Sequence, residues 1–458
     1  MPRFNSAEEK YAYMSETPVR TIVLRLAGPS ILSMLISSLY NMADTFFIGK
    51  IGTSATAGVG LVFSVMAVIQ ALGFFFGHGS GNFISMAMGR KQNDQAETMA
   101  AVGFFSCFIF AALLGILGLV FLDSLIWGLG ATATSFGYAR DYAFYILIGM
   151  PFMASSLTLN NQLRFEGSAF FGMIGIVTGA VINIGLDPLF IFVFGMGTAG
   201  AGLATIISQF ISFLILFLQL RRNANIPIRL RNFKPSLFYY RKIISGGLPS
   251  LVRQGLSGVA TVCLNTFAGL WGDAAIAGIS VVNRIAQFAQ SSIIGFGQGF
   301  QPLCGFSYGA KLYKKIKESF DFCTRFSFLV LLALSILGFA FAPGLVAFFR
   351  DDPEVIAIGS AALRFQCLSF PFTGFTALTN MMLQTVNKTR RATLLAMCRQ
   401  GLVFIPVLLV FRALLGLRGI EMAQMLTDFI TLSLSIPFCF AFFREIGVGL
   451  PLKRPTAD

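Results

Sequence analysis

The sequence predicts an all-α polytopic membrane protein, with twelve transmembrane helices in two pseudo-symmetric six-helix lobes. Three observations lead to this fold class: an apolar composition, a long series of apolar segments and an internal repeat. The chain has 458 residues, of which 55% are hydrophobic and 12% are charged, and its mean hydropathy is +0.76. A soluble protein has about twice that charged fraction. The 47 glycines fit helices that approach one another closely within a bilayer.

Twelve apolar segments are long enough to cross a bilayer, which takes roughly 20 residues of helix. The chain before the first segment is polar and lacks the apolar core of a signal peptide, so we expect a short cytoplasmic tail there. The spans are expected near residues 22–48, 57–87, 99–122, 138–162, 169–194, 199–220, 242–267, 276–306, 320–345, 355–385, 392–414 and 420–443.

Lysine and arginine are concentrated in the two tails and in alternate loops of this arrangement. The intervening loops hold only Lys50, Arg350 and Arg418. Because basic loops stay in the cytoplasm, both termini are expected on the cytoplasmic side of an inner membrane. The net charge of +14 then reflects topology and contact with anionic lipids, not nucleic-acid binding. The basic positions are Arg3, Lys10, Arg20, Arg90, Lys91, Arg164, Lys311, Lys314, Lys315, Lys317, Lys388, Arg390, Arg391, Arg444, Lys453, Arg454 and the segment 221–242.

The sequence offers little for metal, disulfide or covalent chemistry. Its seven cysteines are scattered, without a CxxC pair, and most fall inside apolar segments. His78 is the only histidine, which excludes a histidine metal cluster, and we expect it to bond a backbone carbonyl or face a wet cavity. No nucleophile–base set or phosphate-binding loop is present, so an enzyme is not expected.

The first half of the chain matches the second half when the sequence is shifted by 220 residues. Pro29 then falls on Pro249, and Pro151 falls on Pro371. Each copy holds six spans, so both copies have the same orientation and are related by an axis along the membrane normal. The expected domains are an N-terminal lobe at 1–220, a cytoplasmic linker at 221–242 and a C-terminal lobe at 243–458. Two such lobes around a central cleft are the usual body plan for alternating access.

The first span ends in the stretch YNMADTFFIGK, which places a carboxylate at the end of an apolar run. A charge at that position is costly, so Asp44 needs a reason to be there. Tyr40 precedes Asp44 by four residues and therefore shares its helix face. This pair is the first sign of a polar site within the membrane.

A second polar pair lies in the fifth span, where Asn183 and Asp187 are four residues apart and share a helix face. Pro188 follows them and frees one backbone carbonyl. Thr205 lies within two turns of the start of the sixth span. We expect these residues to form a common site for a proton or a hard cation in the outer third of the N-terminal lobe. The alternative is that Asp44 reaches to the membrane interface and Asp187 is a helix-end residue.

The C-terminal lobe lacks these carboxylates, because the repeat pairs Asp44 with Leu264 and Asp187 with Val407. Ion coupling is therefore expected in the first lobe alone. The sequence leaves the partners of Arg399 unassigned, and it does not decide whether Asp428 is structural or faces substrate. The polar residues that are candidates for the substrate cleft are Asn160, Asn161, Gln70, Gln290, Arg284 and Asp428.

Together these features resemble the multidrug and toxic compound extrusion (MATE) family of cation-coupled antiporters over nearly the whole chain. The motifs that carry the resemblance are LAGPSILSMLISSLYNMADTFFIGKIG, GFFFGHGSGNFISMAMGRKQNDQA, NNQLRFEG and INIGLDPLFIFVFGMGTAGAGLAT. The resemblance implies a cation pocket, for H⁺ or Na⁺, and a polar contribution from the fourth span at Asn160 or Asn161. The chain lacks the acids of spans 7 and 10 that other members use, so it resembles the branch with the cation site in the N-terminal lobe. The residues implied for the pocket are Asp44, Asn183, Asp187, Thr205 and Tyr40.

The resemblance implies a multidrug exporter that antiports amphipathic, often cationic, compounds against H⁺ or Na⁺ by alternating access, without a cofactor. Nothing in the sequence demands more than a monomer. One alternative is a lipid-linked oligosaccharide flippase of the same superfamily, whose cleft would be richer in basic residues. Arg253, Arg284 and Arg399 leave room for that alternative. A membrane enzyme or a scaffold is a second alternative, for which the sequence shows no catalytic constellation.

Overall fold

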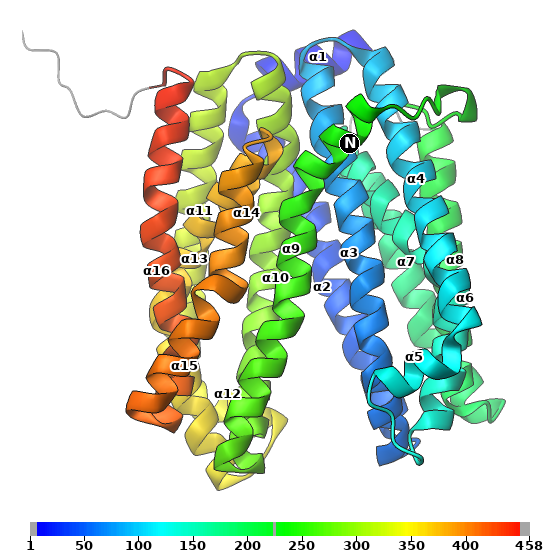
Figure 1. The fold of residues 1–458 in the computed structure, drawn as a ribbon. Coiled ribbons are helices and arrows are strands. Elements are labelled where there is room, and N and C mark those ends of the chain that lie inside the picture. Colours follow the sequence, from blue (N-terminus) through cyan, green and yellow to red (C-terminus); the bar gives the residue numbers. More distant parts are fainter. Residues whose placement is uncertain (1–6, 223–225, 449–458) are drawn as a thin grey trace, which may run out of the picture.

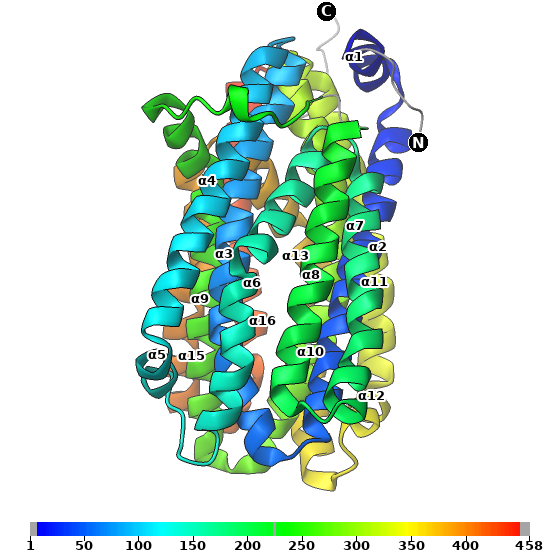
Figure 2. The same cartoon turned by 90° about the vertical axis from the view of Figure 1, so that its right-hand side faces the viewer.

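The computed structural model describes residues 7–222 and 226–448, and in these ranges the only regular elements are helices. Long helices run side by side in two bundles (Figure 1). We call the end that carries α1 (Ala7–Glu16) and linker residues 226–236 the linker end, and the opposite end the far end (Figure 2).

The N-terminal lobe has six long helices, and each corresponds to one of the first six expected spans, with ends that differ by a few residues. A short helix, α5 (Leu122–Gly128), follows the third span. The long helices are α2 (Val19–Gly49), α3 (Thr53–Gly89), α4 (Asn93–Val120), α6 (Phe136–Phe165), α7 (Ala169–Pro188) with the π-helical turn η1 (Leu189–Val193), and α8 (Gly197–Arg222).

The C-terminal lobe repeats this order. Its short helix α12 (Ala342–Phe349) corresponds to α5, and one span is divided by the π-helical turn η4 (Cys398–Leu402). Single turns of 3-10 helix, η2 (Leu230–Asn232) and η3 (Gly269–Trp271), lie in connecting segments. The long elements are α9 (Leu237–Ala268), α10 (Asp273–Gly309), α11 (Tyr313–Ala340), α13 (Pro353–Thr385), α14 (Thr389–Met397) with α15 (Phe404–Leu415), and α16 (Leu417–Glu445).

Ten spans in the described ranges are long and apolar enough to cross a membrane by length and composition. The remaining two expected spans are α9 and α10, which are equally long but more polar. The two helices carry glutamines and arginines that face the space between the lobes. Their lower hydropathy therefore reflects their position at the centre of the protein, and all twelve expected spans are helices.

The internal repeat is visible in the backbone. Lys91 and Lys311 occupy equivalent turns, and both have a φ of 60°. Gly167 and Asn387 also occupy equivalent turns, with φ values of 88° and 59°. Left-handed conformations are uncommon outside glycine and asparagine, so their recurrence at a spacing of 220 residues is strong evidence for one duplicated backbone.

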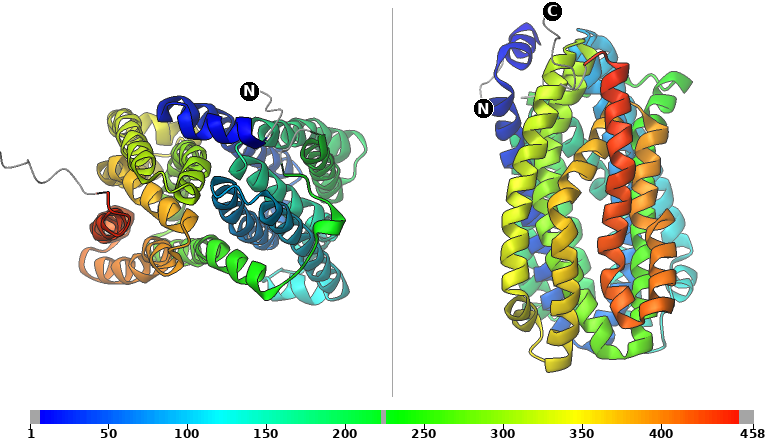
Figure 3. Two further views of the ribbon diagram at one scale, coloured as in Figure 1. Left: turned by 90° about the horizontal axis from the view of Figure 1, so that it is seen from above. Right: turned by 90° about the vertical axis from the view of Figure 1, so that its left-hand side faces the viewer.

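The two lobes contact each other mainly through equivalent helix pairs, α3 with α9 and α2 with α10. Seen from the linker end, the lobes lie next to each other around these central helices (Figure 3). Glycines allow the close approach, because a Cβ at Gly79 would overlap the backbone of Ile243, and one at Gly299 would overlap Ala27. The bundles meet at the linker end and diverge toward the far end (Figure 1).

The expected polar tail forms a helix over the residues that the structure describes, which the sequence analysis did not predict. The helix α1 lies across the linker end. Tyr11 packs edge-on against Phe306, with ring centroids 5.1 Å apart. Lys315 donates from Nζ to the carbonyl oxygens of Met14, Ser15 and Thr17 at 2.8–2.9 Å. Residues 1–6 lie outside the described ranges.

Candidate functional site

Asp44 lies in the last turns of α2 near the far end, and its side chain is only 2% exposed. The hydroxyl of Tyr142, on α6, donates to Asp44 Oδ2 at 3.5 Å. Asp44 Oδ1 is buried without a hydrogen-bond partner. The side chain therefore points into the lobe and does not reach the membrane interface, which removes the interfacial alternative for Asp44.

Asn183 and Asp187 lie on α7 and are both buried. Asn183 Nδ2 donates to Asp187 Oδ1 at 3.3 Å and to Thr205 Oγ1, on α8, at 3.5 Å. Asp187 Oδ2 and Asn183 Oδ1 are buried without a partner. The structure therefore brings three of the expected site residues into direct contact.

Helices α2 and α7 pack against each other, and the two carboxylates are close enough to interact electrostatically. Tyr40, one turn before Asp44 on α2, is near both carboxylates and also lines a cavity between the lobes, described below. We refer to Tyr40, Asp44, Asn183, Asp187 and Thr205 as the carboxylate cluster. In the described ranges, neither carboxylate of this cluster forms an ion pair with a basic side chain.

The carboxylate cluster has the chemistry of a site for a hard cation or a proton. Two carboxylates without basic partners are costly in a buried setting unless a proton or a cation neutralises them. The three unpartnered oxygens, on Asp44, Asp187 and Asn183, are the ligand type that a hard cation binds. The donor set therefore fits Na⁺ as well as a proton.

Tyr142 is the member of the site that sequence reasoning missed. It is fully buried, and its hydroxyl also lies 3.7 Å from the sulfur of Met66. It is one of several tyrosines in the fourth span, and nothing in the sequence separates it from a packing residue. Only the arrangement of α6 beside α2 shows that it contacts Asp44.

Pro188 changes the helix immediately after the carboxylate cluster. The α-helical turns of α7 end at this residue and continue as the wider turn η1. Proline lacks the N–H that an α-helix needs at this position, so a change of helical geometry is expected there. Asp187 therefore sits at an irregular part of the span.

A cavity of about 590 Å³ lies between the lobes. Both lobes contribute to its wall, and three sequence-predicted residues, Gln70, Gln290 and Arg284, line it. Tyr40 also lines this cavity, so the carboxylate cluster lies directly behind its wall. This contact places the candidate ion site next to the candidate substrate site.

Asp428 does not line the cavity. Its Oδ1 accepts from Arg399 Nε at 2.9 Å and from Gln424 at 3.2 Å, and its Oδ2 accepts from Ser369 at 3.3 Å. The side chain of Asp428 is 3% exposed. Asp428 therefore forms a buried ion pair with Arg399, which favours the structural role of the two that the sequence left open.

The asparagines of the fourth span lie away from the carboxylate cluster. Asn160 packs against Gly172 near the start of α7, and Asn161 accepts a hydrogen bond from Arg164 at 2.6 Å. Asn183 lies 11 residues further along α7 than Gly172, or roughly 16 Å along the axis. Neither asparagine joins the cluster, which corrects the contribution implied by the family resemblance.

His78 belongs to a polar network that closes the cavity at the linker end. Arg164 donates to His78 Nε2 at 3.3 Å, and His78 Nδ1 lies 3.1 Å from Ser250 Oγ and 3.2 Å from the carbonyl of Phe74. Because arginine cannot accept a hydrogen bond, His78 carries its proton on Nδ1. Gln384 donates to Ser250 at 2.8 Å and so extends the network to α13.

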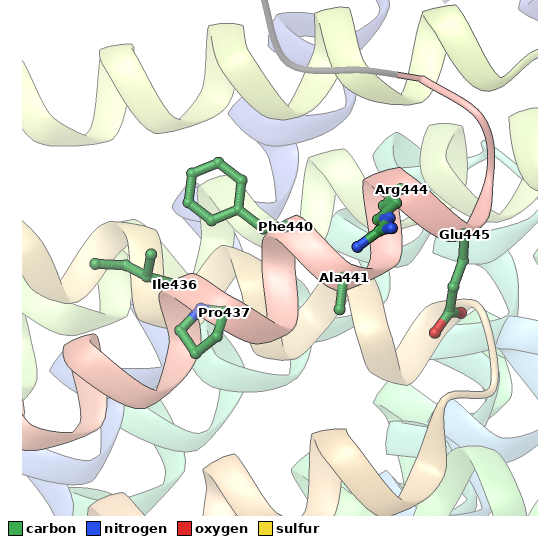
Figure 4. A pocket seen from close by; sticks show the side chains of 6 residues that line it. All are labelled: Ile436, Pro437, Phe440, Ala441, Arg444 and Glu445. Carbon is green, nitrogen blue, oxygen red and sulfur yellow. The ribbon is translucent and has the colours of Figure 1, made fainter. Parts of the chain in front are cut away.

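A hollow on the outer side of α16 is lined by residues of this one helix, from Ile436 to Glu445 (Figure 4). Its lining is mostly apolar, from Ile436 to Ala441, and Arg444 and Glu445 follow toward the end of the helix. Within residues 7–222 and 226–448, no second element contributes a side chain to it. It is a groove on the surface of a span and provides no constellation for chemistry.

A family model described as MatE matches two stretches of the chain, residues 29–189 and 249–410. They cover more than half of the chain, and their starts are 220 residues apart, the offset of the internal repeat. The chain belongs to the MatE family. The sequence-based recognition of this family is therefore confirmed.

This MatE protein is similar over almost its full length to bacterial proteins named multidrug export protein MepA. The protein from Staphylococcus haemolyticus is 26% identical over 444 residues, which cover 96% of this chain and 98% of the relative. The protein from Staphylococcus saprophyticus is 26% identical over 425 residues, which cover 92% and 93%.

Solved structures share the fold of this MatE protein. A crystal structure described as MATE in complex with MaL6 has a TM-score of 0.91 at 26% identity, and covers 96% of this chain and 99% of its own. A structure described as the outward-facing conformation of a multidrug resistance MATE family transporter has a TM-score of 0.91 at 25% identity, and covers 98% and 100%. The twelve-span, two-lobe architecture is thereby confirmed, and the protein is a multi-pass membrane transporter and not an enzyme.

Proposed function

We propose that this protein exports drug-like small molecules from the cell, and that the carboxylate cluster couples export to the entry of H⁺ or Na⁺. Export of multiple drugs is supported by relatives named multidrug export protein. Coupling is supported by one observation above all: three buried oxygens, on Asp44, Asp187 and Asn183, have no hydrogen-bond partner. Such a set is stable when a cation or proton occupies it and costly when it is empty.

Transport in this proposal proceeds by alternating access. The described conformation is closed at the linker end by the network around His78 and by close contacts between α3 and α9. In this proposal the linker end faces the cytoplasm, which the basic linker supports. The cavity is then accessible from the outside, which is the state in which a coupling ion would enter and a substrate would leave.

Tyr40 connects the two sites. Its side chain belongs to the carboxylate cluster and also forms part of the cavity wall. An ion that neutralises Asp44 and Asp187 removes the repulsion between them and allows α2 and α7 to pack more closely. Such a movement of α2 displaces Tyr40, changes the cavity wall and releases the substrate.

The test uses purified protein in liposomes, with a proton gradient and a sodium gradient imposed separately. We expect one of these gradients to drive the accumulation of a transported dye against its own gradient. An ionophore that collapses that gradient should stop accumulation. Transport that ignores both gradients would contradict the proposed coupling while leaving facilitated export possible.

A further inference from the structure

The central cavity carries a one-sided charge that the proposed ion coupling does not use. In the described ranges, the titratable groups other than tyrosine that line it are His78, Arg253, Arg284 and Arg399. No aspartate or glutamate of these ranges lines it. The carboxylates behind its wall are buried: Asp44 and Asp187 lie in the N-terminal lobe behind Tyr40, and Asp428 lies in the C-terminal lobe, bonded to Arg399.

One of the three arginines is already neutralised. Arg399 forms its ion pair with Asp428 at 2.9 Å. In the described ranges, Arg253 and Arg284 form neither an ion pair nor a hydrogen bond. They come from α9 and α10, the two spans that flank the lobe interface. Arg253 is half-buried and Arg284 is exposed, so both guanidinium groups are open to a partner that enters the cavity.

The wall around these arginines is rich in neutral hydrogen-bonding groups. The carboxamides next to them in the sequence, Gln254 and Asn283, both line the cavity, and so do Gln287 and Gln290. Guanidinium and carboxamide groups together bind carboxylate, sulfonate or phosphate oxygens well. They offer no counter-charge to an ammonium group, which Arg253 and Arg284 would repel.

The opposite wall is more apolar. The N-terminal lobe contributes Met66, Ile69, Phe74 and Met153 to the same cavity. Flexible methionines and an aromatic ring pack against varied apolar bodies. The cavity therefore has a mainly polar and basic wall on the C-terminal lobe, and the N-terminal lobe adds apolar surface among its own polar residues.

We propose that the substrates of this protein are organic anions, with Arg253 and Arg284 binding the anionic group and the wall of the N-terminal lobe holding the apolar body. This inference rests on the proposed function only in taking the central cavity as the transport path. It replaces the sequence-based expectation of amphipathic cations as the usual cargo. The carboxylate cluster and the two arginines are then separate sites: the cluster binds the coupling ion, and the arginines bind the substrate.

The test compares two dyes with the same xanthene ring system and opposite charge, anionic fluorescein and cationic rhodamine 123. Dissociation constants are measured by fluorescence anisotropy with purified wild-type protein in an uncharged detergent. We expect fluorescein to bind about tenfold more tightly than rhodamine 123, or better, which corresponds to one strong charge-assisted contact. Equal affinity, tighter binding of rhodamine 123, or binding of neither dye would overturn the inference.

Substitutions of the two arginines test whether the anionic group of the dye binds at Arg253 and Arg284. Arg253→Gln and Arg284→Gln should each weaken fluorescein binding about tenfold without weakening rhodamine 123, and Arg253→Lys should recover part of the loss because it keeps the charge. Arg350→Gln, an exposed residue outside the cavity, is the matched control and should bind both dyes as wild type does. Melting temperatures show whether each variant is folded. Wild-type fluorescein affinity in both glutamine variants would overturn the assignment.

A lipid headgroup is another source of an anionic group. Adding phosphatidylglycerol to the detergent separates the two sources, because a small-molecule site should keep its affinity for fluorescein. Complete displacement by the lipid would overturn the small-molecule form of the inference. The binding assay needs no gradient, so a failure of gradient-driven export leaves its result intact. Conversely, gradient-driven export of rhodamine 123 together with weak fluorescein binding would contradict the preference for anions and leave the proposed export function intact.

Discussion

Gly89 and Gly309 lie against each other's helices at the linker end, and they are equivalent residues of the two repeats. A Cβ at Gly89 would overlap the carbonyl of Phe306, and one at Gly309 would overlap the carbonyl of Met86, which is the repeat equivalent of Phe306. Helices α3 and α10 therefore cross at a point that each lobe builds in the same way. Backbone atoms on both sides leave no room for a side chain.

This crossing predicts that Gly309→Ala opens the linker end. The added methyl meets backbone, which cannot move aside cheaply, so the closed state should lose roughly 1–3 kcal/mol. A loss of that size shifts an equilibrium by about 5- to 150-fold. The measurement is the rate at which a maleimide added at the linker end labels Ser250→Cys, a fully buried position in the closed network.

The control for this prediction is Gly258→Ala in α9, where an added Cβ meets nothing within 4 Å. Both changes replace a helical glycine by alanine, but only the one at Gly309 adds a methyl group that meets backbone. Equal labelling rates in the two variants would show that the crossing does not limit opening.

The ion pair between Arg399 and Asp428 predicts a stability effect in the C-terminal lobe. Asp428→Asn leaves Arg399 without its counter-charge, and breaking a buried pair in this way costs roughly 3–5 kcal/mol. We expect the lower end of that range, because the side chain of Arg399 is 19% exposed. The double variant Arg399→Gln with Asp428→Asn should recover much of the lost melting temperature. If the loss in the double variant equals the sum of the losses in the two single variants, the residues are not coupled.

Lys10 and Glu166 predict a pH-dependent attachment of α1 to the N-terminal lobe. Both side chains are buried, and the charge of each acts on the other. Burial lowers the pKa of Lys10 and raises the pKa of Glu166 from its ordinary value of 4.5. In Lys10→Met, Glu166 is the only one of these two groups that can still titrate, and burial still raises its pKa. Its contribution to docking is then fully present below pH 4.5 and is lost as the pH rises through the raised value.

The measurement is the accessibility of Tyr11→Cys in a Lys10→Met background over a range of pH. We expect the cysteine to become less accessible as the pH falls. Adding Glu166→Gln should remove this pH dependence, because glutamine does not titrate. An accessibility that is flat with pH in Lys10→Met alone would mean that Glu166 does not hold α1.

The distribution of basic residues predicts that the linker end faces the cytoplasm. Position 232 is a poor place for a label, because Asn232 Nδ2 donates to Glu97 at 2.8 Å. Lys234 is exposed in the same segment. A cysteine at residue 234 should react with an impermeant maleimide only after the cells are broken. Reaction in intact cells would reverse the orientation of both lobes.

Much of the fold could be predicted because each span carries its own signal. The length of each apolar segment predicted a helix, and the 220-residue repeat predicted the two lobes without any knowledge of contacts between helices. The helix α1 was missed because AEEKYAYMSE is polar, and its helical state depends on docking to Phe306 and Lys315. Packing against the rest of the protein, and not the local sequence pattern, therefore makes α1 a helix.

The candidate site was predictable where residues share one helix. Asn183 with Asp187, and Tyr40 with Asp44, follow from a spacing of four residues. Contacts between helices were not predictable in this way: Tyr142 with Asp44, and Arg399 with Asp428, depend on how spans pack. Depth along a span was a useful guide, since Thr205 joined the cluster from the outer end of its helix and Asn160, near the inner end, did not.

The coupling role of the carboxylate cluster is tested most directly by gradient-driven dye accumulation in liposomes that contain Asp187→Asn or Asp44→Asn. Asparagine keeps the shape of the neutralised carboxylate and cannot bind or release the ion, so the lobe should no longer respond to the gradient. We predict that each variant is folded and still exchanges dye between the two sides, but accumulates none against its gradient. Asp123→Asn, which changes an exposed carboxylate paired with Arg140, is the control and should accumulate dye as wild type does. Full uphill accumulation by both Asp187→Asn and Asp44→Asn, at matched amounts of protein, would contradict a coupling role for these carboxylates.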